Sequence, residues 1–382
     1  MQVHSKENFL SKYGLGVLFG IWTISTIIYV SVFGLNSSLE AVKYIGAARE
    51  LLQNGRLPET RYWFYFLTIA FIGGSLFFKC GLTGAFLLQA AYNLFAYYFF
   101  YRALKKLFDS CLTPVLIIVY LLLFWPYQSW ITFLYTESAF YSSVLLLFSC
   151  IVLYPATNLR NLIKTAAALL LTIISRPLGI LFIGNTGLYL LNKMPKKQRI
   201  AAGILILFAA IAAVRIVDTI FSTISDWTIM KPFVEENIIC DLPSQKSDTA
   251  LQLARSGSPL YQLLYYCVHN PAHFFHFAFI KLKYFFGATR SYYSTAHNAF
   301  LLMNMLPIYL LAIGATIKVK MKSNIKPFIW ITIGLFTLAI ALQCDDWHNR
   351  FILAIYPFFV ILAAYGLEGL LRFFKHKDTS VQ

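Results

Sequence analysis

Long apolar stretches alternate with short polar or charged connections along the whole chain. Most of these stretches approach the roughly 20 apolar residues with which an α-helix crosses the hydrocarbon core of a bilayer. Ten of them are predicted to span a membrane: residues 13–34, 83–101, 111–127, 138–155, 162–175, 178–192, 200–220, 298–316, 327–343 and 351–370. The pattern therefore predicts an all-α, polytopic bundle of about ten transmembrane helices.

The first polar interruption, residues 35–61, predicts a short amphipathic helix. Glu40 and Tyr44 are four residues apart and therefore share one face of such a helix. Asn54-Gly55 is a typical helix end. We expect this helix at the membrane surface, where it places a carboxylate at the mouth of a mostly apolar protein.

Residues 62–80 are apolar and long enough to cross a bilayer, but the charge distribution argues against a crossing. With ten spans and a cytoplasmic N-terminus, five basic clusters fall on the cytoplasmic side, as the positive-inside rule requires. They are Arg102/Lys105/Lys106, Arg160/Lys164, Lys193/Lys196/Lys197/Arg199, Lys318/Lys320/Lys322/Lys326 and Arg372/Lys375/Lys377. A crossing at 62–80 would move all of them outside, so this segment is predicted to be an interfacial or re-entrant element on the external side.

A second long interruption, residues 221–297, has a polar first part and an aromatic, basic second part. The second part is apolar on one face and predicts helices that lie on the outer membrane surface. The predicted organisation has three parts. They are an N-terminal transmembrane module at 1–220 with a first external loop at 35–82, an external loop at 221–297, and C-terminal transmembrane helices with a short cytoplasmic tail at 298–382.

Composition excludes a soluble protein. Hydrophobic residues make up 59% of the 382 residues and charged residues only 13%, with a mean hydropathy of +0.65; soluble domains carry about 25% charged residues. The net charge of +16 is attributed to the positive-inside rule and to an anionic lipid substrate, and not to nucleic acid. The first apolar segment is too long for a cleavable signal peptide and is expected to be a span.

The six cysteines are scattered. Cys111 and Cys150 lie in apolar segments and are expected to be packing residues. Cys240, Cys267 and Cys344 fall in predicted external loops, where a Cys240–Cys267 disulfide could form. The sequence contains no CxxC motif or His/Cys cluster that would indicate zinc.

Ionisable residues at a membrane edge are costly to keep and are therefore functional candidates. The predicted topology collects several on the external side: Glu40 in the first loop, Glu137 in FLYTESAF, Arg176 in ISRPLG and Arg350 in CDDWHNR. Carboxylates that face cations beside lipid suit transfer of a group from a lipid-linked phosphate. A carboxylate would deprotonate the acceptor, and the planar, always charged guanidinium groups would stabilise the departing phosphate.

Structural roles compete with these assignments. Ser37-x-x-Glu40 also fits a capping box, in which Glu40 only ties down the start of the helix. Glu137 could cap its own helix together with Thr136, and Arg176 could snorkel to the interface.

The remaining external ionisable residues have their own alternatives. Arg215 and Asp218 are predicted to form a structural ion pair. His269 and His273 are expected to be interfacial contacts. The rest of the basic residues that line the aromatic loop are Lys281, Lys283 and Arg290.

The segment CDDWHNR could also bind a divalent metal, Mg or Mn. Asp345 and Asp346 are adjacent carboxylates, and His348 follows two residues later. No other cofactor is indicated.

Four stretches resemble GT-C membrane glycosyltransferases. The first loop, with Glu40 four residues before Tyr44 and then AARELLQNGRLPE, resembles the first-loop helix in which these enzymes place their catalytic acid. FLYTESAF resembles a span junction of GPI mannosyltransferase-like members. ISRPLG and WHNRFILAIYPFFVILAAYGL resemble the basic turn and final span of the bacterial branch related to protein O-mannosyltransferases and aminoarabinose transferases.

This resemblance implies a polyprenyl-phosphate sugar donor and an inverting direct displacement on the external face of a bacterial inner membrane. It implies that Glu40 is the base, with Glu137 as the second candidate, and that Arg176 and Arg350 contact the donor phosphate. Arg290 is a further candidate for the phosphate. Donor or acceptor contacts are expected from Tyr44, Arg61, His297 and His348. Most members carry aspartate where this chain has glutamate at position 40. The acceptor, whether protein, lipid or glycan, is not specified.

Two other classes remain open at this point. A polysaccharide polymerase or ligase that uses pyrophosphate-linked glycans would depend on loop residues such as Arg290 and His297, and not on Glu40. A lipid or sugar transporter would show inverted repeats and broken helices around a midplane site. The sequence contains no evident repeat, and its polar residues gather at one face.

Overall fold

The computed structural model describes residues 2–155, 158–193, 196–223, 230–240, 242, 250–318, 321 and 325–379, and these are α-helical apart from connections and two isolated β-bridges. The first half contains α1 (Gln2–Phe33), α2 (Glu40–Asn54), η1 (Thr60–Tyr65), α3 (Phe66–Phe77), α4 (Gly81–Leu107), α5 (Leu112–Leu123), α6 (Trp125–Gln128), η2 (Ser129–Thr132), α7 (Thr136–Leu153) and α8 (Leu159–Ile173). The second half contains η3 (Pro177–Ile180), α9 (Leu181–Lys193), α10 (Lys196–Thr223), α11 (Lys231–Val234), α12 (Pro259–His269), α13 (Pro271–Gly287), α14 (Thr295–Lys318), α15 (Lys326–Leu342), η5 (Trp347–Asn349) and α16 (Arg350–Thr379).

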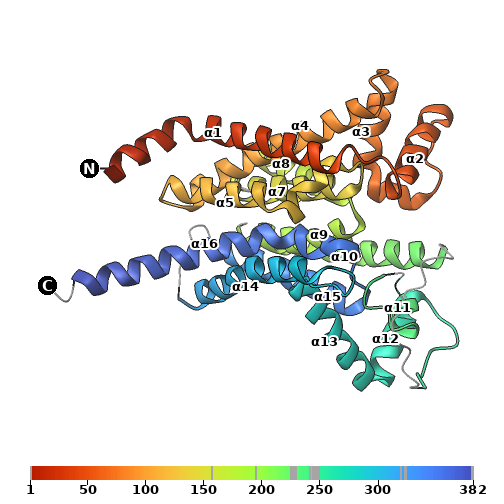
Figure 1. The fold of residues 1–382 in the computed structure, drawn as a ribbon. Helices are drawn as coiled ribbons and strands as arrows, with labels where there is room; N and C mark the ends of the chain where they lie inside the picture. Colours follow the sequence, from red (N-terminus) through yellow and green to blue (C-terminus); the bar gives the residue numbers. More distant parts are fainter. Residues whose placement is uncertain are drawn as a thin grey trace.

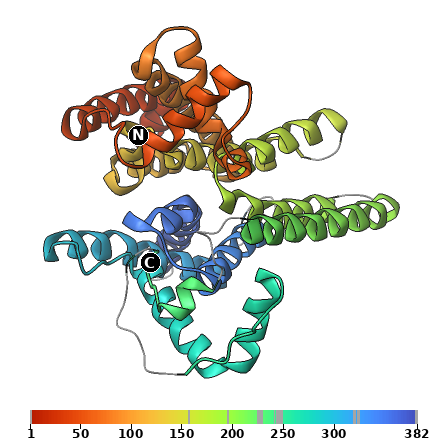
Figure 2. The ribbon, with the colours of Figure 1, turned by 90° about the vertical axis from the view of Figure 1, so that its right-hand side faces the viewer.

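The helices form two layers. α1 to α7 make one layer and α14 to α16 belong to the other, and the two layers meet where α16 packs against α5 and α7 (Figure 1). The end-on view shows α8, α9 and α10 leading away to one side (Figure 2). Both termini lie at one end of the molecule, and α2, α3, α11 and α12 lie at the opposite end (Figure 1).

The core lies along α7 and the first half of α16. α7 is buried along almost its whole length, as expected for a helix that is apolar or small on every side. Its serine hydroxyls donate within the helix: Ser143 Oγ to Ala139 O and Ser149 Oγ to Leu145 O, at 2.8 and 2.6 Å. These bonds satisfy polar atoms that would otherwise be costly to bury.

All ten segments predicted as spans are helical or mainly helical in the structure. In the described part of the chain, four helices are long and apolar enough to cross a membrane: Tyr13–Phe33, Thr136–Leu153, Thr295–Thr316 and Trp347–Arg372. A fifth candidate is the pair Leu112–Leu123 and Trp125–Thr132, which is bent by 71°. The predicted all-α architecture is therefore confirmed, together with helices suited to a membrane, whereas ten crossings remain a prediction.

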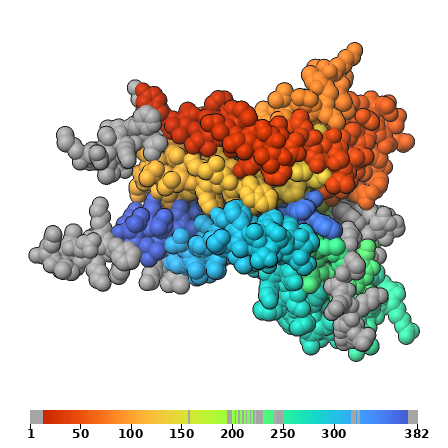
Figure 3. Space-filling view, viewed as in Figure 1, coloured from red at the N-terminus to blue at the C-terminus, as the bar shows by residue number. Residues whose placement is uncertain are grey.

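An apolar outer face accompanies these helices. α1, α5 and α14 lie side by side on the face shown in Figure 3. Large apolar side chains are exposed on all three, including Phe19, Ile27, Leu116, Met303 and Leu310. Such a face suits contact with lipid acyl chains.

Residues 62–80 form η1 and α3. α3 has 12 residues and is therefore about 18 Å long, which is shorter than the roughly 30 Å hydrocarbon core. That this segment does not cross the membrane stays a prediction.

The predicted helix after the first span is present as α2. It ends at Asn54, and Gly55 follows in the left-handed conformation (φ 67°) with its N–H donating to Leu51 O at 3.0 Å. The alternative capping box is wrong. A capping box would need Ser37 at the N-cap, but the N-cap residue is Leu39, which makes no side-chain cap bond, and Glu40 is the first residue of the helix. The Glu40 side chain has other partners.

Two predicted pairings in the second half are also wrong. Cys240 forms a disulfide with Cys344, and Cys267 is free. Asp218 Oδ1 accepts a hydrogen bond from Leu260 N at 2.9 Å, which ties α10 to α12, and the described residues show no ion pair between Asp218 and Arg215. Of the predicted external loop, residues 224–229, 241 and 243–249 lie outside the described residues.

Candidate functional site

Five charged side chains meet at the end of the molecule that lies away from both termini. We call this group the charge cluster; it consists of Glu40, Glu137, Arg176, Asp346 and Arg350. Arg176 Nη1 donates to Glu137 and its Nη2 donates to Asp346. Arg350 Nη1 donates to Glu40 and also lies 3.2 Å from Glu137 Oε1 and 3.9 Å from Asp346 Oδ2. Three carboxylates thus share two guanidinium groups.

The turn between α8 and η3 fixes Arg176. A residue before proline is driven out of the α region, and Arg176 accordingly has an extended backbone (φ −165°, ψ 149°) between the end of α8 and Pro177. The turn closes through Gly179 N donating to Arg176 O at 2.8 Å. A Cβ on Gly179 would meet the carbonyl oxygen of Thr172 at 2.2 Å, so this close approach requires glycine.

Glu137 lies in the first turn of α7, where the helix dipole favours a negative charge. Its side chain is fully buried, at 0% exposure. Exposure within the cluster rises from Glu137 through Asp346, at 15%, to Glu40, at 20%. Glu40 is therefore the carboxylate most accessible to an incoming molecule.

Arg350 begins α16 and is held from several sides. Its carbonyl accepts a hydrogen bond from Tyr141 OH at 2.8 Å, and its guanidinium lies over the rings of Trp130 and Tyr135 at 5.0 and 5.5 Å. Such cation–π contacts stabilise a charged group that is mostly removed from water. Arg350 belongs to one layer of the molecule, and its contacts with the other layer fix its position and orientation.

Glu40 is surrounded by donors. Its Oε1 accepts from Tyr44 OH at 2.8 Å and pairs with Lys43 Nζ at 2.9 Å, and its Oε2 faces Arg350. Burial would raise the pKa of Glu40, but Arg350, Lys43 and Arg176 outweigh it and lower the pKa to about 2. Glu40 is therefore ionised at neutral pH, and in this arrangement it is a weak base.

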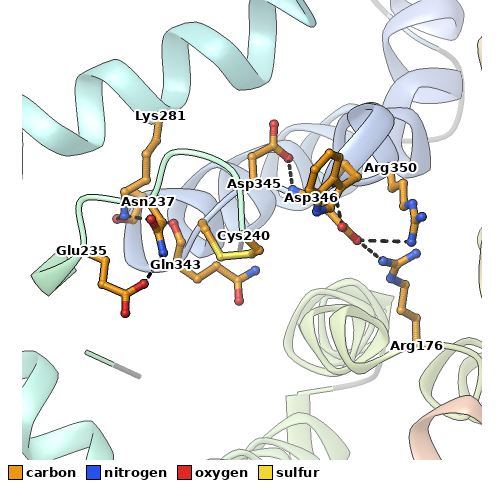
Figure 4. Close-up of a disulfide and its surroundings, with 12 residues drawn as sticks. Arg176, Glu235, Asn237, Cys240, Lys281, Gln343, Asp345, Asp346 and Arg350 are labelled. Atoms are coloured by element: carbon orange, nitrogen blue, oxygen red, sulfur yellow. Dashed lines mark hydrogen bonds and ion pairs between the residues drawn. A yellow bond between two sulfur atoms is a disulfide. The ribbon is translucent and has the colours of Figure 1, made fainter. Parts of the chain in front are cut away.

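Asp346 belongs to the short loop that carries the disulfide. Figure 4 shows Arg176 and Arg350 reaching Asp346 from two directions, with the Cys240–Cys344 disulfide on the same loop. The loop is also held by backbone bonds: Asp345 N donates to Ile238 O at 2.9 Å, and Cys240 N donates to Asp345 O at 2.8 Å. A covalent link and a β-bridge thus tie residues 238–240 to the side of the charge cluster.

Two polar atoms in the cluster are buried and without a hydrogen-bond partner among the described residues. They are Glu137 Oε2 and Arg350 Nε. Buried polar groups are nearly always paired, so such atoms call for an explanation. One is an acceptor and the other a donor, so together they could bind a ligand that carries both a hydroxyl group and an anionic oxygen.

Several predicted site residues lie elsewhere or have structural roles. Arg61 pairs with Glu59 at 2.9 Å and stays outside the cluster. Arg290 is fully buried and bonds Asp345 Oδ2 at 2.5 Å and the carbonyls of Tyr284 and Thr289, so it supports the loop.

The suggested metal site is not supported. Asp345 faces Arg290 and Asp346 faces Arg176, so each carboxylate already has a cationic partner. Among the residues that the structure describes, no group of three or more His, Cys, Asp or Glu side chains could hold a metal ion.

Of the predicted contact residues, Tyr44 and His348 lie at the site. Tyr44 is buried against Tyr65, with ring centroids 5.4 Å apart, and donates to Glu40. His348 stacks with Tyr293 and lies near Trp130, whereas His297 stacks with Tyr293 and lies near Trp125, outside the charge cluster.

Sequence reasoning missed three contributors. Asp346 was considered only as a metal ligand, although it bridges both arginines. Lys43 lies three residues after Glu40, a spacing that does indicate a neighbour on a helix. Trp130, under Arg350, has no local sequence signal, since 220 residues separate the two.

Comparisons with protein-family models, with curated proteins and with solved structures find no match to this chain.

Proposed function

We propose that this chain is an integral membrane glycosyltransferase that moves a sugar from a polyprenyl-phosphate donor to an acceptor. The single observation that carries the proposal is the charge cluster. Residues far apart in the sequence bring two arginines and three carboxylates together at one end of an apolar helical molecule. Removing these charges from water costs free energy unless they interact with a ligand or with each other.

The proposed reaction is a single displacement. The acceptor hydroxyl oxygen attacks the anomeric carbon, and the bond from that carbon to the phosphate oxygen breaks with its electron pair leaving on the polyprenyl phosphate. The acceptor proton passes to Glu40. Arg176 and Arg350 stabilise the negative charge that develops on the phosphate, since guanidinium groups bind phosphate oxygens in a planar, charge-assisted way.

Glu40 needs a change of partner before it can act as a base. While Arg350 contacts it, the pKa of Glu40 is about 2, too low for efficient proton transfer near neutral pH. A donor phosphate that draws Arg350 away removes the largest cationic influence on Glu40 and raises its pKa. Glu137 remains the second candidate, because its Oε2 is unpartnered although the side chain is fully buried.

Backbone strain supports a ligand at this position. Leu39, which precedes Glu40, has φ 51°, and His348 and Asn349, which precede Arg350, have φ 56° and 61°. Left-handed backbone at non-glycine residues costs about 1–3 kcal/mol each and clusters at ligand sites. Strain at both chain segments that lead into the cluster suits a site that is held ready for a ligand.

We place the charge cluster on the external face of a bacterial inner membrane, in a GT-C type bundle with ten crossings. The Cys240–Cys344 disulfide supports this side, because disulfides persist in oxidising compartments. The basic residues at the C-terminal ends of α4 and α16 also support an external charge cluster. These helix ends lie at the end of the molecule opposite to the cluster, and basic residues favour the cytoplasmic side of a membrane.

The test is a donor panel with purified protein in lipid nanodiscs and a membrane extract as the source of acceptor. The panel contains polyprenyl monophosphate sugars, pyrophosphate-linked oligosaccharides and nucleotide sugars, and the readout is release of the carrier. The proposal predicts turnover of a monophosphate sugar. Turnover of pyrophosphate-linked donors alone would contradict it and would instead indicate a polymerase or ligase.

A further inference from the structure

A groove of about 370 Å³ lies between α9 and α15. It starts at the last residue of α9 and at the first turn of α15, whereas the charge cluster follows the other end of α15. The groove is therefore a separate place in the fold. Its walls include Asn185, Leu188, Tyr189 and Lys193 of α9 and Phe328 and Ile331 of α15.

Asn185 forms the floor of the groove and is only 1% exposed. Its Nδ2 donates to Phe328 O at 2.8 Å and to Thr332 Oγ1 at 2.5 Å. The Thr332 hydroxyl donates its own proton to Phe328 O at 2.9 Å, so both partners of Asn185 are acceptors and must face its NH₂ group. The oxygen Oδ1 is then left over, and it has no hydrogen-bond partner among the described residues.

An unpartnered acceptor at this position calls for a donor from outside the chain. Both helices belong to predicted spans, at 178–192 and 327–343, where bulk water is scarce. Buried polar groups are nearly always paired, and one that stays unpaired costs about 1–3 kcal/mol. A ligand that enters the groove with a hydroxyl group would remove this cost.

The open end of the groove is basic. Lys193 is exposed, and its Nζ lies over the Tyr189 ring, 5.7 Å from the centroid. Asn185, Tyr189 and Lys193 are four residues apart and share one face of α9, so the ammonium is turned back along the helix toward Asn185. Residues 138–217 and 249–344, which contain both helices, include no Asp or Glu. The charge at the groove therefore favours an anion.

The outer walls of the groove are apolar. Leu188 is 48% exposed and Ile331 is 37% exposed, and both lie in predicted spans. Such side chains suit contact with an acyl chain, which a soluble anion does not have. A cation, a buried acceptor and apolar walls together fit an anionic phospholipid whose headgroup carries hydroxyl groups. Basic pockets between transmembrane helices are known to bind lipid headgroups in this way.

We propose that this groove is a binding site for an anionic phospholipid with a hydroxylated headgroup. The phosphate lies at Lys193, a headgroup hydroxyl donates to Asn185 Oδ1, and an acyl chain follows Leu188 and Ile331. This site is additional to the charge cluster and does not depend on the proposed transfer reaction.

The experiment titrates the purified protein in detergent with single lipids and follows the first bound lipid by native mass spectrometry. Phosphatidylglycerol and phosphatidylpropanol carry the same charge, but only phosphatidylglycerol has headgroup hydroxyl groups. We expect wild type to bind phosphatidylglycerol about 10-fold more tightly than phosphatidylpropanol, equivalent to about 1.4 kcal/mol. Phosphatidylcholine, which has neither net charge nor headgroup hydroxyl groups, is expected to bind more weakly than both.

Two variants separate the contributions of charge and hydroxyl recognition. Lys193→Gln is expected to weaken binding of both anionic lipids by about 5-fold and to keep their ratio. Asn185→Leu removes the acceptor and is expected to bring the ratio near 1; if it does not fold, the wild-type ratio and Lys193→Gln still decide. Lys164→Gln is the matched control, because Lys164 lies over the Tyr154 ring at 4.0 Å but outside the groove, and it should resemble wild type.

Three results would overturn the inference. They are equal binding of phosphatidylglycerol and phosphatidylpropanol by wild type, unchanged affinity for both lipids in Lys193→Gln, and displacement of the lipid by an equal concentration of soluble glycerol phosphate. The last result would assign the groove to a soluble phosphate ester. Failure of the donor panel would overturn the proposed function without changing any of these lipid affinities, so the two failures are distinguishable.

Discussion

Arg350 contacts more of the charge cluster than any other side chain we describe. Its Nη1 faces Glu40, Glu137 and Asp346, while its Nε is buried and unpartnered among the described residues. An anion that binds Nε competes for this guanidinium with the carboxylates. The consequence is that binding at Arg350 and protonation of Glu40 are linked.

Glu40 should stabilise the folded protein in a pH-dependent way. Its folded pKa of about 2 is below the ordinary value of 4.5, so the stabilisation is present above pH 4.5 and is lost as the pH falls toward 2. At pH 7 it is about 3 kcal/mol. Glu40→Gln is expected to lower the thermal unfolding temperature at pH 7, and the difference from wild type should shrink by about half near pH 3.

Glu59→Gln is the control for this prediction, because Glu59 forms an exposed pair with Arg61. Exposed pairs contribute about 0–1 kcal/mol, so this variant should unfold close to wild type at every pH. A Glu40→Gln effect that is independent of pH would contradict the pKa assigned to Glu40.

At the scale of elements, the loop between α15 and α16 determines whether the site is assembled. It places Asp346 and Arg350 in the cluster and is fixed by the Cys240–Cys344 disulfide and the Arg290–Asp345 pair. A loop of this kind has little secondary structure of its own, so the disulfide and the ion pair hold its conformation.

The disulfide should contribute stability and hold the loop. Cys344→Ser opens a link across 104 residues of sequence, which is expected to cost about 2–4 kcal/mol and to reduce donor affinity. Thermal unfolding and donor binding provide the two readouts. Cys80→Ser, at an exposed free cysteine, should change neither; equal behaviour of the two variants would show that the disulfide does not support the site.

The Arg290–Asp345 pair is buried at both ends, at 0% exposure for each side chain. Asp345→Asn leaves Arg290 as an uncompensated buried cation and is expected to cost about 3–5 kcal/mol in unfolding free energy. Adding Arg290→Leu should recover part of this loss. Glu235→Gln, in the neighbouring loop, is the control, and an equal effect of Asp345→Asn and Glu235→Gln would rule out the predicted role.

Much of the architecture could be predicted from local sequence. Apolar stretches and the Asn54-Gly55 stop are local signals, and the helices and the end of α2 occur where the sequence predicts them. Glu40, Glu137, Arg176 and Arg350 stand out in the sequence because charge is costly at a membrane edge. The partner of Cys240 and the bridging role of Asp346 depend on how distant segments pack, and a single sequence carries no signal for that.

At the scale of the whole molecule, the direction of each helix relative to a membrane is the main remaining prediction. Cys80, at the start of α4, and Arg102, near the end of α4, are expected on opposite sides. A membrane-impermeant maleimide should label Cys80 in intact cells. In a Cys80→Ser background, Arg102→Cys should be labelled only after permeabilisation.

The reverse labelling pattern would mean that the whole topology is inverted, and it would place the charge cluster on the cytoplasmic side, since Glu40 and Glu137, on either side of residues 62–80 in the sequence, both contact Arg350. Peptide mapping of the labelled protein separates these sites from Cys267, which is free and partly exposed in the predicted external loop.

The central claim is that the charge cluster transfers a sugar from a polyprenyl monophosphate. It is tested most directly by comparing carrier release and donor binding in wild type, Glu40→Gln, Glu137→Gln and Glu59→Gln. We predict that Glu40→Gln binds donor but loses at least about 100-fold in turnover, as expected for loss of a general base, while Glu59→Gln resembles wild type. Wild-type turnover in Glu40→Gln would contradict the mechanism, and loss confined to Glu137→Gln would transfer the role of base to Glu137.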